Sequence, residues 1–148
     1  MVIPKPNIKW KGNYEPVIGS LREAGLNVLE VQNFSEYELV RAYNNFKLFL
    51  YLTNPKVKEG FGYPPLEAMA CSCAVISTSC CEYLVAGENC LIINNENDID
   101  YIVRLVQQVL TNPEHCGIIK EGYKTAQQYD FNKTVDRFEE ALQSGTDL

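Results

Sequence analysis

The hydrophobic residues of this chain follow two alternating patterns, which predict strands and helices in turn. Short, almost continuous apolar runs such as FKLFLYL at 46–52 are typical of strands buried on both faces. Longer segments such as 98–110 carry apolar residues three and four positions apart, which is the spacing of an amphipathic helix. The predicted strands are residues 27–31, 46–52, 74–77 and 90–93. The predicted helices are residues 15–24, 35–44, 64–72, 82–86 and 98–110, then one that begins at Asn112 and one that runs from 131 to 142.

Local signals place the ends of several of these helices. Ser35 is of the residue type that caps helix N-termini, and Gly87 can end the short helix at 82–86. Pro64 and Pro65 suit the first turn of the helix at 64–72, because proline has a preset φ and that turn needs no N–H donor. Asn112, which is followed by a proline, predicts the start of the next helix.

Strands that alternate with helices predict a Rossmann-like α/β fold, in which a doubly wound parallel sheet is covered by helices on both faces. Because 148 residues with 46% hydrophobic content suffice for one core, we expect a single domain over residues 1–142. Residues 143–148 are expected to form a flexible tail. Sheets of this kind bind ligands beyond the carboxyl ends of their strands, and the loop at 54–63 leaves the strand at 46–52 at such an end.

That loop and the helix after it contain the best candidate for chemistry, EGFGYPPLEAMAC at 59–71. Glu59 lies in the loop and Glu67 near the helix start, so both carboxylates can face one cleft. Carboxylates accept hydrogen bonds from paired sugar hydroxyls, and free amides at a helix start attract phosphate oxygens. Two glutamates at this spacing are, however, also common as solvated charges. Gly60 and Gly62 favour a site, because glycine lets the backbone approach a ligand closely, although they also serve tight turns.

Composition narrows the classes of partner. A net charge of -6 argues against general binding of nucleic acids or anionic membranes, which requires clustered Lys and Arg. No run of 18 apolar residues and no secretory leader is present, and we therefore expect a cytoplasmic protein.

The residues of metal sites and of common catalytic motifs are also sparse. The six cysteines form no CxxC pair and His115 is the single histidine, so no metal site is expected and the cysteines are interpreted as reduced core residues. The GxGxxG, GxxxxGK[ST] and GxSxG motifs are absent, which removes the main support for dehydrogenase, P-loop and serine hydrolase functions.

The segment EGFGYPPLEAMAC resembles the E-x7-E signature of retaining nucleotide-sugar glycosyltransferases with the GT-B fold. FSEYELVRAYNNFKLFLYLT before it, AVISTS after it and the later GENCLII resemble the helix and strands that surround the signature in that family. The resemblance covers about residues 26–142. It implies that the chain is the C-terminal, donor-binding half of a GT-B enzyme.

The resemblance also implies a role for each site residue. Glu59 would be the catalytic residue and would hydrogen-bond the donor sugar, assisted by the backbone of Gly60, Phe61 and Gly62. Glu67 would hold the ribose. The remaining nucleotide contacts would come from residues near the helix start and the end of the strand at 27–31, namely Tyr63, Leu66 and Asn33.

The implied reaction transfers a hexosyl unit from a nucleoside diphosphate sugar to a saccharide or lipid-linked acceptor, without a cofactor or metal. The family's opening strand, the Arg/Lys pair after it and the N-terminal acceptor domain are not recognisable here. We therefore expect an incomplete fragment that transfers little sugar alone, that associates with membranes only through the missing domain, and that self-associates if a central strand is lost. Whether residues 3–10 supply that strand is open.

Two alternatives remain at this point. One is a non-catalytic module that binds nucleotide sugars or a protein partner. The other is a nucleotide-sugar epimerase of the same fold.

Overall fold

The core of the fold is a parallel sheet, seen in a computed structural model. The structure describes residues 1–4, 14–53, 61–78, 81–112 and 115–130, together with 132, 133, 135, 136, 139 and 140. Within these residues the sheet has the order β2-β1-β3-β4-β5, and all pairings are parallel. The strands are β1 (Val2–Pro4), β2 (Leu29–Val31), β3 (Leu48–Tyr51), β4 (Ala74–Thr78) and β5 (Leu91–Ile93).

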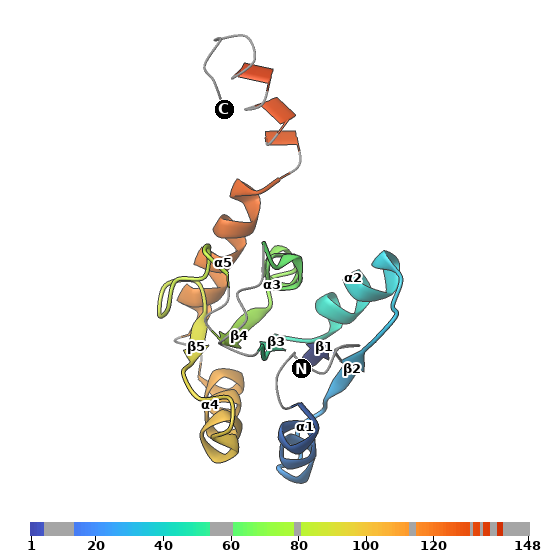
Figure 1. Cartoon of the computed structure of the whole chain (residues 1–148), viewed down its shortest axis with the longest axis vertical. Helices are drawn as coiled ribbons and strands as arrows, with labels where there is room; N and C mark the ends of the chain where they lie inside the picture. Colours follow the sequence, from blue (N-terminus) through green and yellow to red (C-terminus); the bar gives the residue numbers. More distant parts are fainter. Residues whose placement is uncertain are drawn as a thin grey trace.

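Helices cover the sheet on both faces (Figure 1). The helices α1 and α4 lie on one face, and α2, α3 and α5 lie on the other. Their bounds are α1 (Tyr14–Glu23), α2 (Glu36–Asn45), α3 (Tyr63–Ala70), α4 (Ile99–Thr111) and α5 (Cys116–Gln128). The predicted Rossmann-like α/β fold class is therefore confirmed.

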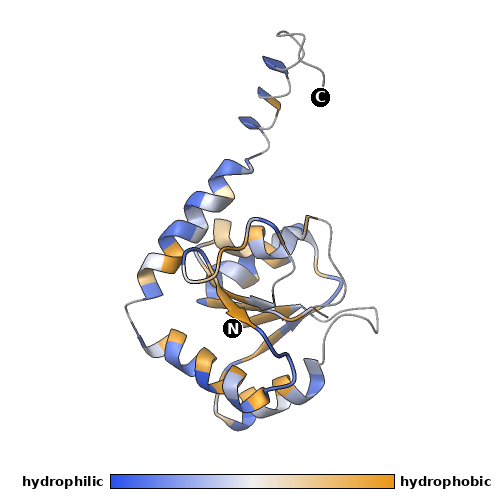
Figure 2. Cartoon of the chain, turned by 60° about the vertical axis from the view of Figure 1, so that its left-hand side comes forward, coloured by the Kyte–Doolittle hydropathy of each residue, from blue (hydrophilic) through white to orange (hydrophobic). Residues whose placement is uncertain are grey.

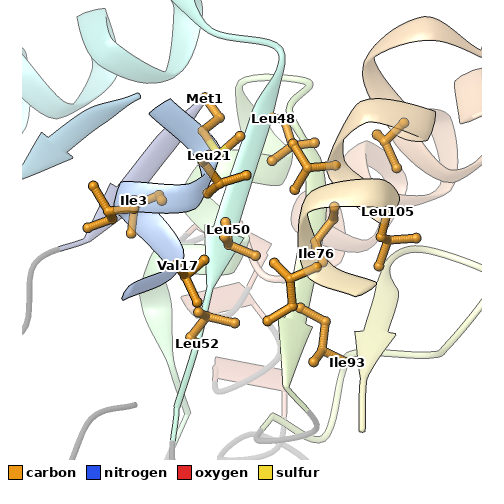
Figure 3. Packing of buried hydrophobic residues seen from close by; sticks show 14 of the residues in the cluster. Met1, Ile3, Val17, Leu21, Leu48, Leu50, Leu52, Ile76, Ile93 and Leu105 are labelled. Carbon is orange, nitrogen blue, oxygen red and sulfur yellow. The ribbon is translucent and has the colours of Figure 1, made fainter. Parts of the chain in front are cut away.

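The two faces of the sheet form two separate hydrophobic cores, because successive side chains of a strand point to opposite sides. In β3 and the residue after it, Leu48, Leu50 and Leu52 pack toward α1 and α4 (Figure 3). Phe49 and Tyr51 pack into the core under α2, α3 and α5. All five side chains are buried. β3 is thus hydrophobic on both faces, whereas the helices carry hydrophilic residues as well (Figure 2).

The predicted helix that begins at the cap Ser35 is confirmed in detail. The Ser35 Oγ accepts a hydrogen bond from the Glu38 amide at 3.4 Å, and the Glu38 carboxylate accepts one from the Ser35 amide at 2.8 Å. This reciprocal pairing is a capping box, which satisfies two donors at the helix start. The helix predicted at 98–110 is α4, with the Asp98 side chain as its N-cap.

The prediction of a short helix at 82–86 is wrong. This segment is a turn followed by an isolated bridge between Ala86 and Cys90. The buried Asn89 side chain accepts a hydrogen bond from the Val85 amide at 2.8 Å and donates one to the Tyr83 carbonyl at 2.7 Å. A side chain that takes these backbone partners stabilises a loop in place of a helix.

The helix predicted to begin at Asn112 begins later, because Asn112 is the C-cap of α4 and donates its N–H to the Gln108 carbonyl. The helix in that region is α5, and Pro113 lies outside the described residues. Of the helix predicted at 131–142, the described residues are helical, while the tail at 143–148 lies outside the description.

The N-terminal residues supply a strand that the sequence pattern did not reveal. β1 pairs with β2 on one side and with β3 on the other, so it is an interior strand of the sheet. The open question about the first strand is thus answered by residues 2–4, while most of residues 3–10 lie outside the description. Pairing on both sides removes the exposed edge from which we expected self-association.

Among the described residues, no helix combines the length and the apolar character needed to span a membrane.

Candidate functional site

The site is organised by the start of α3, which follows β3 at the carboxyl edge of the sheet. The helix begins at Tyr63, one residue before the predicted start, and ends at Ala70. Gly62 is the N-cap and adopts a left-handed conformation with φ 69° and ψ 67°, which glycine reaches without strain. Pro64 and Pro65 occupy the first turn, as predicted. These two prolines carry no N–H. Tyr63, the first helical residue, has an N–H that no intrahelical bond uses and that can be offered to a ligand.

The carboxylate of Glu67 lies against α2. The Tyr43 hydroxyl, on a side chain that is itself buried, donates a long hydrogen bond of 3.4 Å to Glu67 Oε2. Glu67 remains accessible to solvent. Burial by the surrounding side chains raises the pKa of its carboxyl, the Tyr43 hydrogen bond opposes this, and the charge of Glu36 raises the pKa further. The weak internal hydrogen bond leaves the carboxylate able to accept donors from a ligand.

Two hollows flank this pair, and both are lined by Leu39, Tyr43 and Glu67. The larger, of about 300 Å³, lies between α2 and α3 and also involves Glu36. The smaller, of about 200 Å³, extends to the end of β2. Its lining adds Pro4, Val31, Gln32, Asn33, Phe34 and Pro64. The smaller hollow therefore joins the carboxyl ends of β1 and β2 to the start of α3.

Two of the predicted nucleotide contacts thus meet in one hollow. Asn33 and Glu67 are 34 residues apart in sequence and line the same 200 Å³ space. Asn33 has a φ of 57°, a left-handed conformation that asparagine tolerates better than most residues. Leu66 is different, because its side chain is 6% exposed and packs into the core, so this side chain is not available to a ligand.

Phe61 belongs to a neighbouring aromatic cluster. Its ring centroid lies 5.1 Å from that of Tyr63, 5.5 Å from Tyr83 and 5.2 Å from Tyr129. Tyr83 is buried, and its hydroxyl donates a hydrogen bond to the Gly62 carbonyl. The cluster joins the loop before α3 to the loop before β5 and to the end of α5.

A second link at the carboxyl edge joins β3 to β4. The Thr78 Oγ1 accepts a hydrogen bond from the Thr53 amide at 2.9 Å and lies 2.6 Å from the Thr53 hydroxyl. Both residues are buried. Thr53 is the last described residue before the loop that carries the predicted sugar contacts.

Glu59 and Gly60 lie outside the described residues, so their roles stay predictions. Neither Tyr43 nor Tyr83 was among the site residues predicted from the sequence. Tyr43 carried a weak signal, since it is four positions after Leu39 on the inner face of α2 and has a polar end. No group of three His, Cys, Asp or Glu side chains within the described residues is arranged to hold a metal ion.

The parallel sheet and the hollow at its carboxyl edge define a Rossmann-like α/β domain of the kind found in GT-B structures. Residues 12–125 match the family described as Glycosyl transferases group 1, and the chain belongs to this family.

The relatives found are much longer than this chain. The serotype-specific mannosyltransferase WbdA of Escherichia coli is 29% identical over 118 residues, which are 75% of this chain and 14% of the relative. A second WbdA sequence is 34% identical over 77 residues, which are 51% of this chain and 9% of the relative. The chain therefore spans a small part of the proteins that it resembles.

Solved structures share the fold. The C-terminal domain of the glycosyl transferase group 1 family protein LpcC from Francisella tularensis has a TM-score of 0.61 and 24% identity, covering 80% of this chain and 63% of that one. Anabaena Alr3699/HepE, crystallised with UDP and glucose, has a TM-score of 0.71 and 14% identity, covering 97% of this chain and 48% of that one.

Proposed function

We propose that this chain is the donor-binding half of a retaining hexosyltransferase, which uses a nucleoside diphosphate sugar. The observation that carries the proposal is the 200 Å³ hollow that brings Asn33, Pro64 and Glu67 together at the carboxyl edge of the sheet. Ligands of open α/β sheets bind at this edge. Membership of the Glycosyl transferases group 1 family supports transfer over the epimerase and the non-catalytic module.

The nucleoside would occupy this hollow. Its volume is below the ~300–1,000 Å³ of whole ligand pockets, so it suits one part of a nucleotide sugar. The base would lie near Asn33 at the end of β2. The ionised carboxylate of Glu67 would accept hydrogen bonds from the two ribose hydroxyls, in place of its 3.4 Å contact with Tyr43.

The diphosphate would then face the start of α3. The helix dipole and the unpaired amides of a first turn attract anions, and Tyr63 supplies the unpaired helical amide here, because Pro64 and Pro65 carry no N–H. The sugar would lie beyond the diphosphate, held by Glu59 and by the backbone of Gly60, Phe61 and Gly62. This direction follows the chain, because these residues immediately precede the helix start.

Transfer with retention would rest on positioning and on stabilising the departing diphosphate. An oxocarbenium-like transition state is expected by analogy with glycoside hydrolysis. The acceptor would be held by an N-terminal domain outside these 148 residues, and we expect the chain alone to transfer little sugar. Coverage of 14% of one WbdA sequence is consistent with a larger enzyme.

Calorimetric titration of the chain with UDP-, GDP-, ADP- and dTDP-sugars tests the proposal. We expect nucleotide sugars of one nucleotide class to bind. Glu67→Gln should weaken this binding about tenfold or more, because hydrogen bonds to a charged group contribute about 1.5–3 kcal/mol. Glu36→Gln is the matched control, since Glu36 lines only the larger hollow. The proposal fails if no nucleotide sugar binds, or if Glu67→Gln and Glu36→Gln bind equally well.

The sugar half of the site is tested separately by Glu59→Ala. This variant should weaken binding of the nucleotide sugar but leave binding of the corresponding nucleoside diphosphate unchanged. Equal affinity of Glu59→Ala and of the unchanged chain for the nucleotide sugar would contradict the proposed role of Glu59.

A further inference from the structure

One hydrogen bond fixes the backbone at the start of α3 from outside the helix. The Tyr83 hydroxyl, 21 positions along the chain, donates to the Gly62 carbonyl. Tyr83 is 6% exposed, so the ring is enclosed and its hydroxyl has few other directions available. The ring contacts Phe61 at 5.5 Å and Tyr129 at 5.8 Å between centroids.

The backbone of Tyr83 is held as firmly as its ring. Asn89, which is 4% exposed, donates from Nδ2 to the Tyr83 carbonyl at 2.7 Å and to the Thr125 hydroxyl at 3.0 Å. Its Oδ1 accepts from the Val85 amide at 2.8 Å. The loop that carries Tyr83 is thus fixed to α5, which packs against α3.

The bond from Tyr83 has a consequence for the next amide. In a planar trans peptide the C=O of one residue and the N–H of the following residue point in opposite directions. A carbonyl of Gly62 directed at Tyr83 therefore directs the Tyr63 N–H away from Tyr83. Gly62 adopts a left-handed conformation, and glycine also populates other conformations readily, so the local sequence does not itself select this peptide orientation.

We propose that Tyr83 is a positioning residue for the diphosphate, acting through the Gly62–Tyr63 peptide. Its hydroxyl holds this peptide so that the Tyr63 N–H faces the phosphate oxygens. The inference rests on the proposed function, because Tyr63 offers the first amide of the helix to which we assign the diphosphate. It adds a residue from the loop between β4 and β5 that contacts no part of the ligand.

The test uses Tyr83→Phe, which keeps the ring contacts and removes only the hydroxyl. Tyr129→Phe is the matched control, since it removes a hydroxyl from an exposed ring of the same cluster. Binding of UDP, GDP, ADP and dTDP, and of the nucleoside corresponding to the tightest of these, is followed by NMR titration. The titration covers weak as well as tight binding, and the Tyr63 amide signal is recorded throughout.

We expect Tyr83→Phe to weaken binding of the nucleoside diphosphate about three- to tenfold, in line with the loss of one neutral hydrogen bond. Nucleoside affinity should change less than about twofold by the same reasoning, because the hydrogen bond acts on the phosphate end. The Tyr63 amide shift on diphosphate binding should shrink. Tyr129→Phe should behave as the unchanged chain does.

Three outcomes would overturn the inference. Tyr83→Phe could bind the diphosphate as tightly as the unchanged chain, or it could weaken diphosphate and nucleoside equally, which indicates a general structural role. Tyr129→Phe could also show the same loss as Tyr83→Phe. Failure of the unchanged chain to bind any nucleotide is a separate result, since it refutes the proposed function together with the inference.

Discussion

The link between β3 and β4 at the carboxyl edge should be among the most sensitive polar contacts of the described residues. Thr78→Val keeps the shape of the side chain but removes Oγ1, which pairs with both the amide and the hydroxyl of Thr53. The Thr53 amide and hydroxyl would then be left without this partner in a place that water does not reach, because Thr53 is 2% exposed and Thr78 1%.

The free energy of unfolding should fall by about 2–6 kcal/mol in Thr78→Val, since two buried groups lose their partner and each buried unsatisfied group costs about 1–3 kcal/mol. Thr53→Val should cost about 1 kcal/mol, because the Thr78 hydroxyl keeps the Thr53 amide as a partner. The double variant should cost no more than Thr78→Val alone, because removing the Thr53 hydroxyl also removes one of the two orphaned groups. The two substitutions are therefore expected to be strongly non-additive.

Urea unfolding followed by circular dichroism measures these three variants against the unchanged chain. Thr111→Val is the control, because the Thr111 hydroxyl bonds the Gln107 carbonyl at an exposed helix end where water can replace it. We expect this control to change the unfolding free energy by no more than about 0.5 kcal/mol. A similarly small effect of Thr78→Val, or costs of the two single variants that add in the double variant, would refute the reasoning.

Three further predictions concern the site and the helices around it. Nucleotide affinity should fall as the pH is lowered, because only the ionised carboxylate of Glu67 accepts hydrogen bonds from both ribose hydroxyls. The fall should start at a pH above 4.5, since the pKa of Glu67 is raised above that ordinary value. Glu67→Gln should abolish this pH dependence in titrations at several pH values. Gly122→Ala should destabilise the chain by about 1–3 kcal/mol in urea unfolding, since a Cβ there would lie 3.2 Å from the Asn89 backbone oxygen and from Met69 Cγ. Gly117→Ala in the same helix meets nothing within 4 Å and should stabilise by about 0.5–1 kcal/mol, so equal effects of the two variants would contradict the packing argument. The exposed Cys116 thiol should react with a thiol reagent in the folded chain faster than the buried Cys73, whose pKa burial raises to about 12, and Cys116→Ser should remove one fast-reacting thiol.

The raised pKa of Glu67 also affects the stability of the chain. A carboxyl whose folded-state pKa is raised binds its proton more tightly in the folded chain, so stability falls as the pH rises from 4.5 through the folded-state pKa of Glu67. Glu67→Gln should therefore unfold at a higher urea concentration than the unchanged chain at pH 7, while it binds nucleotide less well. Lower stability of Glu67→Gln at pH 7 would show that the carboxylate is not penalised by its surroundings.

The sequence by itself determined most of the elements, because helices and strands have their own periods. The run at 46–52 contains β3, and the stripe at 98–110 corresponds to α4, which starts one residue later, after its N-cap Asp98. Ser35 capped its helix because capping involves residues three positions apart, which the sequence shows directly. The order of strands and helices then predicted the fold class and the edge at which ligands bind.

The local pattern of hydrophobic residues was not sufficient in two places. Residues 82–86 form a loop because the Asn89 side chain bonds Val85 and Tyr83. β1 is three residues long, too short for a period, and it is a strand because β2 and β3 supply hydrogen-bond partners on both sides. Neither of these partner strands lies near β1 in the sequence.

The candidate site shows the same division. The sequence identified Glu67 and the glycine-proline start of α3 as chemically suitable, and the family resemblance implied Asn33, but neither could show that Asn33 and Glu67 line one hollow. Only the tertiary structure placed the Tyr43 hydroxyl at 3.4 Å from Glu67 and the Tyr83 hydroxyl on Gly62. The physical reason is that local periodicity depends on backbone geometry within a few residues, whereas these contacts depend on how separate elements pack across the sheet.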